Sequence, residues 1–330
     1  MHLVRAFFAA MLLFALPAAA QQPAPPRKLT VAYLKSLSFS PLFLAVEKKY
    51  LAEEGIELDL KIVGAVSEVI AFLGRGQIDA AVGNSGVPLL NAVSRGIEIR
   101  LAGGLGGAPA DAATLSANPI LVRKALFDAG TVKTAADLKG RKLAVNARGG
   151  IVEYQTAQGL KQGGLTIGDV EIVMLRSFPD MLAALSNGAI DASLLPEPLA
   201  ASARSSGIAT TLIANPAPGA MITSLMLGQT LLPEHERPVV EKLLRALRRA
   251  ANELQSPAAI MTPERMAIWS RWVDVPVEVI AQTAPYAFPR DLAIDVADLM
   301  RQQAFLVETG QIPAAVPADR IIDARYAIVK

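Results

Sequence analysis

The sequence predicts an α/β fold made of two related lobes. Three observations lead to this prediction: strands and helices alternate over residues 29–102, short glycine-containing turns join them, and one strand-entry motif occurs twice. The chain has 330 residues, of which 52% are hydrophobic and 19% are charged, so it can form two hydrophobic cores. We therefore expect mostly parallel sheets with helices packed on their faces.

Residues 1–20 are predicted to be a cleavable signal peptide. Arg5 supplies a positive charge, and Ala6–Leu16 is an uninterrupted apolar run that ends before the small residues Ala18–Ala20. The run is shorter than the ~20 residues of a membrane span, and a buried N-terminal helix is the alternative. Cleavage after Ala20 would leave residues 21–28 as a poorly ordered leader. We expect a periplasmic protein without a lipid anchor, because the chain has no cysteine.

The first lobe is predicted to begin with a buried strand. Residues 29–34 are apolar on both faces, as in a parallel strand covered on both sides. Ser40 and Pro41 predict a helix start with Ser40 as N-cap, and Gly55 ends the helix that continues to Glu53. The next expected elements are strand 57–63, helix 67–73, strand 78–83, helix 87–95 and strand 98–102.

The strand-entry motif indicates an internal duplication. Ala71–Ala80 and Ala184–Ala192 each contain a helix end, a glycine turn and an Ile-Asp-Ala step into a strand. Each is followed by a proline and an alanine-rich helix, and Asp79 and Asp191 are 112 residues apart (191 minus 79). The alternative is coincidence, since helix–glycine–strand joints are common in α/β proteins. The spacing favours two related lobes over one long sheet.

The glycine-rich stretch that follows Ala102 is predicted to separate the lobes. We expect Lys142–Asn146 and Ile151–Gln162 to open the second lobe, and Met221–Leu227 to be the return crossing. Helices at 239–254, 263–272, 277–283 and 292–309 should pack back onto the first lobe. The expected divisions are lobe 1 at 29–103, a crossover at 104–119, lobe 2 at 120–220, and the return crossover with the helical completion of lobe 1 at 221–330.

Composition excludes several classes of function. The 32 Lys and Arg residues nearly balance the 30 Asp and Glu residues, so nothing indicates a nucleic-acid partner. The absence of cysteine excludes disulfides and thiolate chemistry, and the two histidines, His2 and His235, are too few for a histidine-based triad or metal centre. We expect no cofactor, no metal and no catalytic residue. A carboxylate-based exported hydrolase stays an alternative, although aromatic residues are only 5% of the chain.

With these features in view, the chain resembles the ABC-transporter periplasmic solute-binding proteins of the nitrate, sulfonate and taurine group. The resemblance is carried by the exported leader, the strand–helix unit Tyr33–Gly55, the paired units Gly76–Ala80 and Gly188–Ala192, and the Glu197-Pro198 step. It implies a type II periplasmic-binding-protein fold, in which two lobes joined by two crossover segments close on a ligand in the cleft between them.

The resemblance also implies partners. A monomer would capture a small organic anion, of the sulfonate or carboxylate type, and deliver it to an inner-membrane permease driven by a cytoplasmic ATPase. A sensing protein that presents its ligand to a membrane receptor would have the same fold and cleft, and this alternative stays open.

Four loops that lead from a strand into a helix form the predicted binding site. Ligands of open α/β sheets bind at the carboxyl ends of the strands, where helix N-termini offer N–H groups and partial positive charge to anions. The guanidinium of Arg148 suits a carboxylate or sulfonate, whereas a solvent-exposed Arg148 is the alternative. Glu197 faces the ligand or the hinge, or pairs with Arg148, because a buried unpaired carboxylate is costly. The predicted ligand-binding residues are Ser38, Phe39, Asn84, Ser85, Arg148, Gly149, Gly150, Ser177, Phe178 and Glu197.

Overall fold

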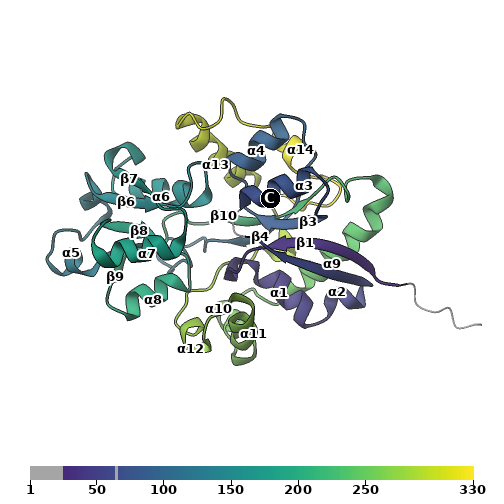
Figure 1. The fold of residues 1–330 in the computed structure, drawn as a ribbon, viewed down its shortest axis with the longest axis horizontal. Helices are drawn as coiled ribbons and strands as arrows, with labels where there is room; N and C mark the ends of the chain where they lie inside the picture. The colour runs from purple at the N-terminus through teal and green to yellow at the C-terminus, as the bar shows by residue number, and fades with distance from the viewer. Residues whose placement is uncertain (1–24, 64–65) are drawn as a thin grey trace, which may run out of the picture.

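The computed structural model describes residues 25–63 and 66–330, and the predicted signal peptide lies outside these residues. The described residues form two α/β lobes that lie side by side along the long axis of the molecule, each built on a five-stranded sheet (Figure 1). In this part of the chain, no helix is both long enough and apolar enough to cross a membrane. The mixed α/β fold class predicted from the sequence is confirmed.

The sheet of lobe 1 has the strand order β2-β1-β3-β10-β4. β1 is parallel to β2 and β3, whereas β10 is antiparallel to β3 and β4. The strands are β1 (Arg27–Tyr33), β2 (Ile56–Ile62), β3 (Ala80–Gly83), β4 (Arg100–Gly107) and β10 (Met221–Leu227). The segment Met221–Leu227, expected as a crossing, is therefore a buried strand inside the first sheet, where seven consecutive buried residues fit a strand covered on both faces.

The sheet of lobe 2 repeats this arrangement with the order β7-β6-β8-β5-β9. β6 is parallel to β7 and β8, and β5 is antiparallel to β8 and β9. The strands are β5 (Ile120–Arg123), β6 (Lys142–Val145), β7 (Glu171–Met174), β8 (Ala192–Leu194) and β9 (Ala209–Ile213). In each sheet one antiparallel strand lies next to three parallel strands, and it is β10 in lobe 1 and β5 in lobe 2. This strand does not belong to the run of alternating strands and helices that forms the three parallel strands.

The duplication is visible residue by residue in the strand pairing. Val31 pairs with Ala80 in lobe 1, and Leu143 pairs with Ala192 in lobe 2. Each residue of the second pair lies 112 positions after its equivalent in the first pair (143 minus 31, 192 minus 80). The aspartate of each motif has the same role, since the carboxylate of Asp79 accepts from the Thr30 N–H at 2.8 Å and that of Asp191 from the Lys142 N–H at 3.0 Å. The internal repeat predicted from the sequence is confirmed.

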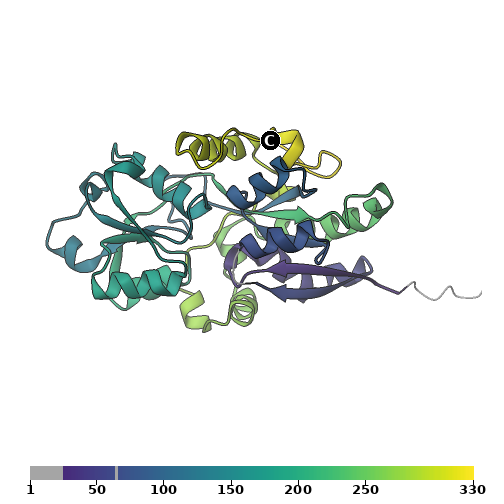
Figure 2. The same ribbon diagram turned by 45° about the horizontal axis from the view of Figure 1, so that its top comes forward.

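Helices cover both faces of the two sheets (Figures 1 and 2). Most begin with a proline, a serine or threonine cap, or a glycine, as their sequences predict. They are α1 (Ser40–Glu47), α2 (Tyr50–Glu53), α3 (Val66–Gly74), α4 (Val87–Ser94), α5 (Lys124–Asp128), α6 (Ile151–Lys161), α7 (Phe178–Asn187), α8 (Leu199–Ser205), α9 (Arg237–Asn252), α10 (Pro257–Ile260), α11 (Pro263–Val273), α12 (Val277–Ile280), α13 (Val296–Glu308) and α14 (Ala318–Ile321).

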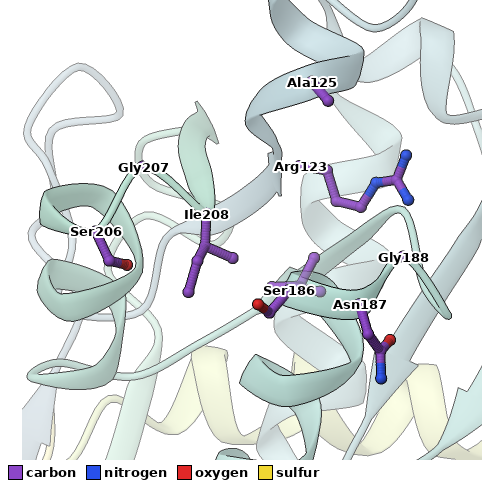
Figure 3. A pocket seen from close by; sticks show the side chains of 9 residues that line it. Arg123, Ala125, Ser186, Asn187, Gly188, Ser206, Gly207 and Ile208 are labelled. Atoms are coloured by element: carbon purple, nitrogen blue, oxygen red, sulfur yellow. The ribbon is translucent and has the colours of Figure 1, made fainter.

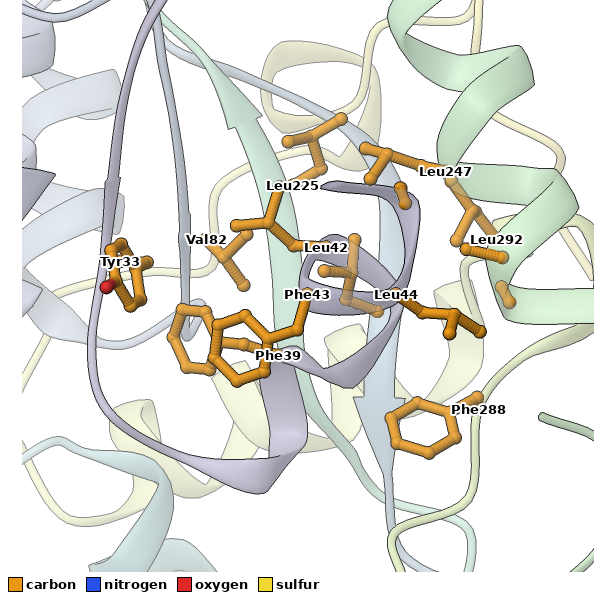
Figure 4. Close-up of a cluster of buried hydrophobic side chains, with 14 of the residues drawn as sticks. Tyr33, Phe39, Leu42, Phe43, Leu44, Val82, Leu225, Leu247, Phe288 and Leu292 are labelled. Carbon is orange, nitrogen blue, oxygen red and sulfur yellow. The ribbon is translucent and has the colours of Figure 1, made fainter. Parts of the chain in front are cut away.

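The larger core of lobe 1 lies between its sheet and the helices α1, α9 and α11 (Figure 4). α9 contributes an apolar stripe at helical spacing, with Val240, Leu243, Leu244 and Leu247 all buried. Phe43 of α1 stacks on Trp272 of α11 with ring centroids 4.6 Å apart. α9 and α11, which follow β10 in the chain, thus pack on α1 of the first lobe.

The helix after β1 differs from the prediction. Ser40 is the first residue of α1 and not its N-cap, and its hydroxyl donates to the Leu37 carbonyl at 2.7 Å. The helix was expected to continue to residue 53, but Lys49 adopts a left-handed conformation (φ 59°) and the chain resumes as α2. This break turns Tyr50 and Leu51 into the core.

The strand before the predicted crossover is also longer than expected. β4 continues through Gly107, past the predicted strand end at residue 102, and pairs with β10 along its length. The glycine-rich sequence predicted a segment that separates the lobes, but in the structure these glycines lie in a strand and permit close packing. A Cβ on Gly106 would lie 2.8 Å from the carbonyl oxygen of Ser38.

Candidate ligand-binding cleft between the lobes

The candidate site lies where the carboxyl ends of the parallel strands of the two lobes meet. Lobe 1 contributes the 3-10 helix η1 (Leu37–Phe39), which follows β1, and the turn 84–86, which follows β3. Lobe 2 contributes residues 146–150 after β6 and 195–198 after β8. The repeat makes these loops equivalent in pairs, so two similar edges face each other. Residues 64–65, between β2 and α3, lie outside the described residues.

The two lobes touch directly at the start of α4. The Val87 N–H donates to the Gly149 carbonyl at 3.0 Å. A Cβ on Gly86 would lie 2.7 Å from that carbonyl oxygen, and a Cβ on Gly149, whose φ is +68°, would lie 2.2 Å from a methyl carbon of Val87. Both glycines are therefore required for this close approach, and an N–H group at the N-terminus of α4 is used by the protein itself.

A buried carboxylate lies at the same contact. Glu153, in the first turn of α6, has a fully buried side chain, whereas 58% of the Arg148 side chain is exposed. One Glu153 oxygen accepts from Nη1 of Arg148 at 2.5 Å, and the other accepts from the Gly149 N–H at 2.8 Å and from Nε2 of Gln311 at 2.9 Å. Gln311 follows α13 of lobe 1, so this cluster joins the two lobes.

A chain of hydrogen bonds crosses the molecule beside this cluster. The hydroxyl of Tyr286 donates to Oδ1 of Asn118 at 2.8 Å, and Nδ2 of Asn118 donates to Oε1 of Gln155 at 2.9 Å. Burial raises the pKa of Tyr286 well above its ordinary value, a hydrogen bond with Ser36 opposes this rise, and the carboxylate of Glu197 adds to it. These side chains come from segments that connect the lobes and from α6.

Among the buried polar atoms that have no hydrogen-bond partner in residues 25–63 and 66–330, three belong to the loops after β3 and β6 and to the start of α6. They are Oγ of Ser85, Oδ1 of Asn146 and Nε2 of Gln155. Buried polar groups are nearly always paired, so these three atoms indicate a place where a polar solute or water completes the hydrogen bonding. In the same part of the chain, no three His, Cys, Asp or Glu side chains are grouped to hold a metal ion.

The predicted residues of lobe 1 are divided between the cleft and the core. Ser38 is buried, and its hydroxyl lies 3.0 Å from that of Ser36. Phe39 points into the core, where its ring stacks on Phe43 with centroids 6.3 Å apart. Asn84 accepts from the Gly86 N–H at 3.2 Å, which is ordinary turn chemistry. Ser85 has the strongest structural case among these residues, because its hydroxyl is buried and unpaired.

The predicted residues of the loop before α7 have local roles. The Ser177 hydroxyl caps α7 by accepting from the Asp180 N–H at 3.2 Å. Phe178 packs against both hydrophobic clusters of lobe 2. Neither side chain is brought next to the Arg148–Glu153 cluster by a contact in the structure, so their contact with a solute stays a prediction.

The expected pairing of Glu197 with Arg148 is wrong. Arg148 pairs with Glu153, and Glu197 has its own arginine, with Oε1 2.6 Å from Nη2 of Arg204. The other oxygen of Glu197 accepts from the Ala201 N–H at 2.7 Å, and the side chain is fully buried. Burial raises the pKa of Glu197 and the hydrogen bond with Arg204 opposes this rise. Its donors are the Ala201 N–H and the Arg204 guanidinium of α8 and, at 3.4 Å, the Ala284 N–H, and contact of Glu197 with a solute stays a prediction.

Several residues of this site were not predicted. Glu153 had a detectable signal, because an acidic residue at the third position of a helix that begins after glycines is typical of a capping residue. Asn118 and Tyr286 had none, since 168 residues separate them and their hydrogen bond depends on the tertiary fold. Gln311 was missed for the same reason.

A surface depression of about 410 Å³ lies elsewhere, at the base of lobe 2 (Figure 3). It is lined by the C-terminal ends of α7 and α8, and the Arg123 guanidinium packs against Gly188, where a Cβ would lie 2.2 Å from Nη1. Helix C-termini carry partial negative charge, which Arg123 complements and which disfavours an anion. The depression is at the opposite end of the strands from the cleft, so the cleft remains the candidate site.

Comparisons with known proteins agree with this architecture. The model of the NMT1-like family matches residues 22–262, which is most of the chain. A search of curated protein sequences finds no significant match.

Solved structures show the same fold. The alkanesulfonate-binding protein SsuA from Xanthomonas axonopodis pv. citri, bound to MOPS, has 21% identity and a TM-score of 0.68, over 93% of this chain and 100% of that one. The periplasmic nitrate-binding protein NrtA from Synechocystis PCC 6803 has 15% identity and a TM-score of 0.69, over 90% and 86%. The desulfurization enzyme DszB has 20% identity and a TM-score of 0.61, over 91% and 96%.

Two of these three structures are binding proteins and DszB is an enzyme. The repeated lobes and the antiparallel strand inserted into each sheet are those of the periplasmic binding fold. The chain therefore belongs to the NMT1-like family, and its fold is that of the periplasmic solute-binding proteins.

Proposed function

We propose that this protein captures a small organic anion, of the sulfonate or carboxylate type, in the cleft between its lobes and delivers it to an ABC importer. The observation that carries the proposal is the set of buried, unpaired polar atoms of Ser85, Asn146 and Gln155 around that cleft. The solutes named for similar proteins, MOPS and nitrate, are anions and support the same class.

The start of α6 supports an anion as the solute. Gly150 is the N-cap residue of α6 and has no side chain to cap the helix, so the partial positive charge of the helix N-terminus lies beside Arg148. The exposed Arg148 guanidinium precedes the helix and carries a positive charge that it shares with Glu153 in an ion pair. Together these groups favour a carboxylate or sulfonate over a neutral sugar.

Binding without chemical change is part of the proposal, although DszB shows that an enzyme can have this fold. The chain has no cysteine, and outside the predicted signal peptide its one histidine is His235. His235 lies in the 3-10 helix η4 (Glu234–Glu236), and 78% of its side chain is exposed. A nucleophile–imidazole pair in the cleft is therefore excluded.

Delivery to a membrane permease is supported by two exposed apolar side chains. Ile62 and Met174 are equivalent in the repeat (174 minus 62 is 112). Ile62 is 58% exposed and Met174 is 45% exposed. Each is the last residue of an edge strand, one on each lobe. We expect the double variant I62S/M174S to bind its solute as the wild type does and to lose solute uptake in cells that depend on this importer. Unchanged uptake would contradict this role.

Calorimetric titration of residues 21–330 tests the proposed function. The panel contains alkanesulfonates, aliphatic and aromatic carboxylates, nitrate, a neutral sugar and a divalent cation. We expect one organic anion per chain to bind and to raise the melting temperature, since ligands that bind only the folded state stabilise it. A sugar or a metal that binds, with no response to any anion, would contradict the proposal.

A further inference from the structure

The buried carboxylate of Glu153 occupies the position that suits the anion of a solute. It holds the guanidinium of Arg148 and the N–H of Gly149, which are the two donors most suited to a carboxylate or sulfonate at this end of α6. We propose that Glu153 is a built-in competitor that lowers the affinity of the cleft for anions and so determines which solutes are retained. This inference rests on the proposed function.

The Gly149 N–H and Nη1 of Arg148 are both held by Glu153, so a second anion cannot use these two donors at the same time. Each Glu153 oxygen is engaged, one by Arg148 at 2.5 Å and the other by Gly149 at 2.8 Å and Gln311 at 2.9 Å. The side chain is fully buried, so repulsion between it and a second carboxylate would be weakly screened. A solute anion that reaches Arg148 and Gly149 must therefore displace Glu153.

The contact is at the junction of the lobes and not on an outer surface. Gly149 also accepts from Val87 of lobe 1, and Gln311 follows α13, which lies over the junction in both views (Figures 1 and 2). Tyr154, next to Glu153, packs edge-on against Phe305 of α13 with ring centroids 5.8 Å apart. Displacement of Glu153 would release Gln311, and solute binding would thus exchange one contact between the lobes for another.

One of the unpaired polar atoms lies at the same place. Ser85 is 4% exposed, its hydroxyl has no partner among the described residues, and it precedes Gly86, which packs on Gly149. A solute bound to Arg148 and Gly149 would have the Ser85 side chain within the same junction.

A purely structural role for Glu153 makes a different prediction. A glutamate in the first turn of a helix can cap it by reaching back to a preceding N–H, as Glu153 does with Gly149. In that case, replacement of Glu153 would change the stability of the protein and would change the affinity for charged and neutral solutes alike. If Glu153 competes with the solute, its replacement would change the affinity for anions selectively.

The variant E153Q separates the two roles, because glutamine keeps the size and the capping group and removes the charge. We expect calorimetric titration of folded E153Q with hexanesulfonate and hexanoate to show binding at least about tenfold tighter than that of the wild type. Binding of the neutral analogue hexanamide should be unchanged. The variant E153D, which keeps the charge, should bind the anions as weakly as the wild type.

The matched control is D169N. Asp169 also closes a capping box in lobe 2, in the 3-10 helix η3 (Ile167–Asp169), but it precedes β7 and lies at the opposite end of that strand from the cleft. Its replacement should leave anion affinity within about twofold of the wild type.

Equal anion affinity in folded E153Q and wild type would overturn the inference while leaving the proposed function intact. Loss of anion binding in E153Q would also overturn it, since Glu153 would then assist the solute. If neither protein bound any sulfonate, carboxylate or nitrate, the proposed function itself would be contradicted and the inference with it.

Discussion

At the scale of single residues, the two buried carboxylates of lobe 2 each have a sequence-local arginine. Glu153 pairs with Arg148 and Glu197 with Arg204, and both glutamates also accept backbone N–H groups at a helix start. Burial of a carboxylate is tolerated when it is paired and hydrogen-bonded. The lobe thus carries two internal anions near the place proposed for an external one.

The Arg148 side chain can be tested directly. We expect R148A to weaken binding of an anionic solute by roughly 1.5–3 kcal/mol, because a charge-assisted hydrogen bond to the solute is lost. Titration of R148A and of R176A with the same anion checks this, since Arg176 is an exposed residue of the loop before α7. Equal affinities of R148A and the wild type would show that Arg148 serves only Glu153.

The raised pKa of Glu197 predicts a pH dependence of stability. Its pKa is higher in the folded state because of burial, so its favourable contribution is complete below the unfolded pKa and is lost as pH rises through the folded pKa. E197Q does not titrate, so its stability relative to the wild type should increase from about pH 4 to pH 7. Urea unfolding of both proteins at the two pH values measures this, and a constant difference would contradict it.

At the scale of elements, the sequence predicted the features that depend on local sequence patterns. The alternating strands and helices and the repeated Ile-Asp-Ala step depend on residues close in sequence, and each is present. The extent of β4 was missed because glycine-rich strands have no side-chain periodicity, and its glycines are explained only by what packs on them. The break at Lys49 was missed because the apolar pattern continues across it.

The glycines of β4 yield a prediction about stability. In G106A the new methyl group would lie 2.8 Å from the Ser38 carbonyl oxygen, so η1 must shift. We expect G106A to destabilise the protein by about 1–3 kcal/mol, as overpacked sites do. G168A is the control, because the nearest atom, Oγ1 of Thr166, would be 3.7 Å away. Denaturant unfolding compares the two, and equal stabilities would show that η1 adapts without strain.

The loops of the candidate site show the same division between local and tertiary information. Their position at the carboxyl ends of the strands followed from the strand–helix order, as the fold class requires. The hydrogen-bond partners of the residues in these loops did not follow from that order. The Tyr286–Asn118–Gln155 chain and the Glu153–Gln311 contact join segments whose proximity only the folded chain creates.

At the scale of the whole molecule, polar contacts join the two lobes at a few places. The Val87–Gly149 hydrogen bond and the Glu153–Gln311 pair join the lobes on one side, and the Tyr286–Asn118–Gln155 chain joins them through the connecting segments. A solute that bonds to both edges adds contacts that exist only when the lobes are together. Its binding should therefore shift the population of lobe arrangements toward one closed state.

Spin-label distances between the lobes test whether the solute binds between them. The chain has no cysteine, so the variant E57C/E171C can be labelled at one exposed position on the edge strand of each lobe. A pair within lobe 2, K161C/E171C, is the control. We predict that a saturating organic anion narrows the interlobe distance distribution to a single closed distance and leaves the control pair unchanged. An anion that binds one per chain without altering the interlobe distribution would contradict a site between the lobes.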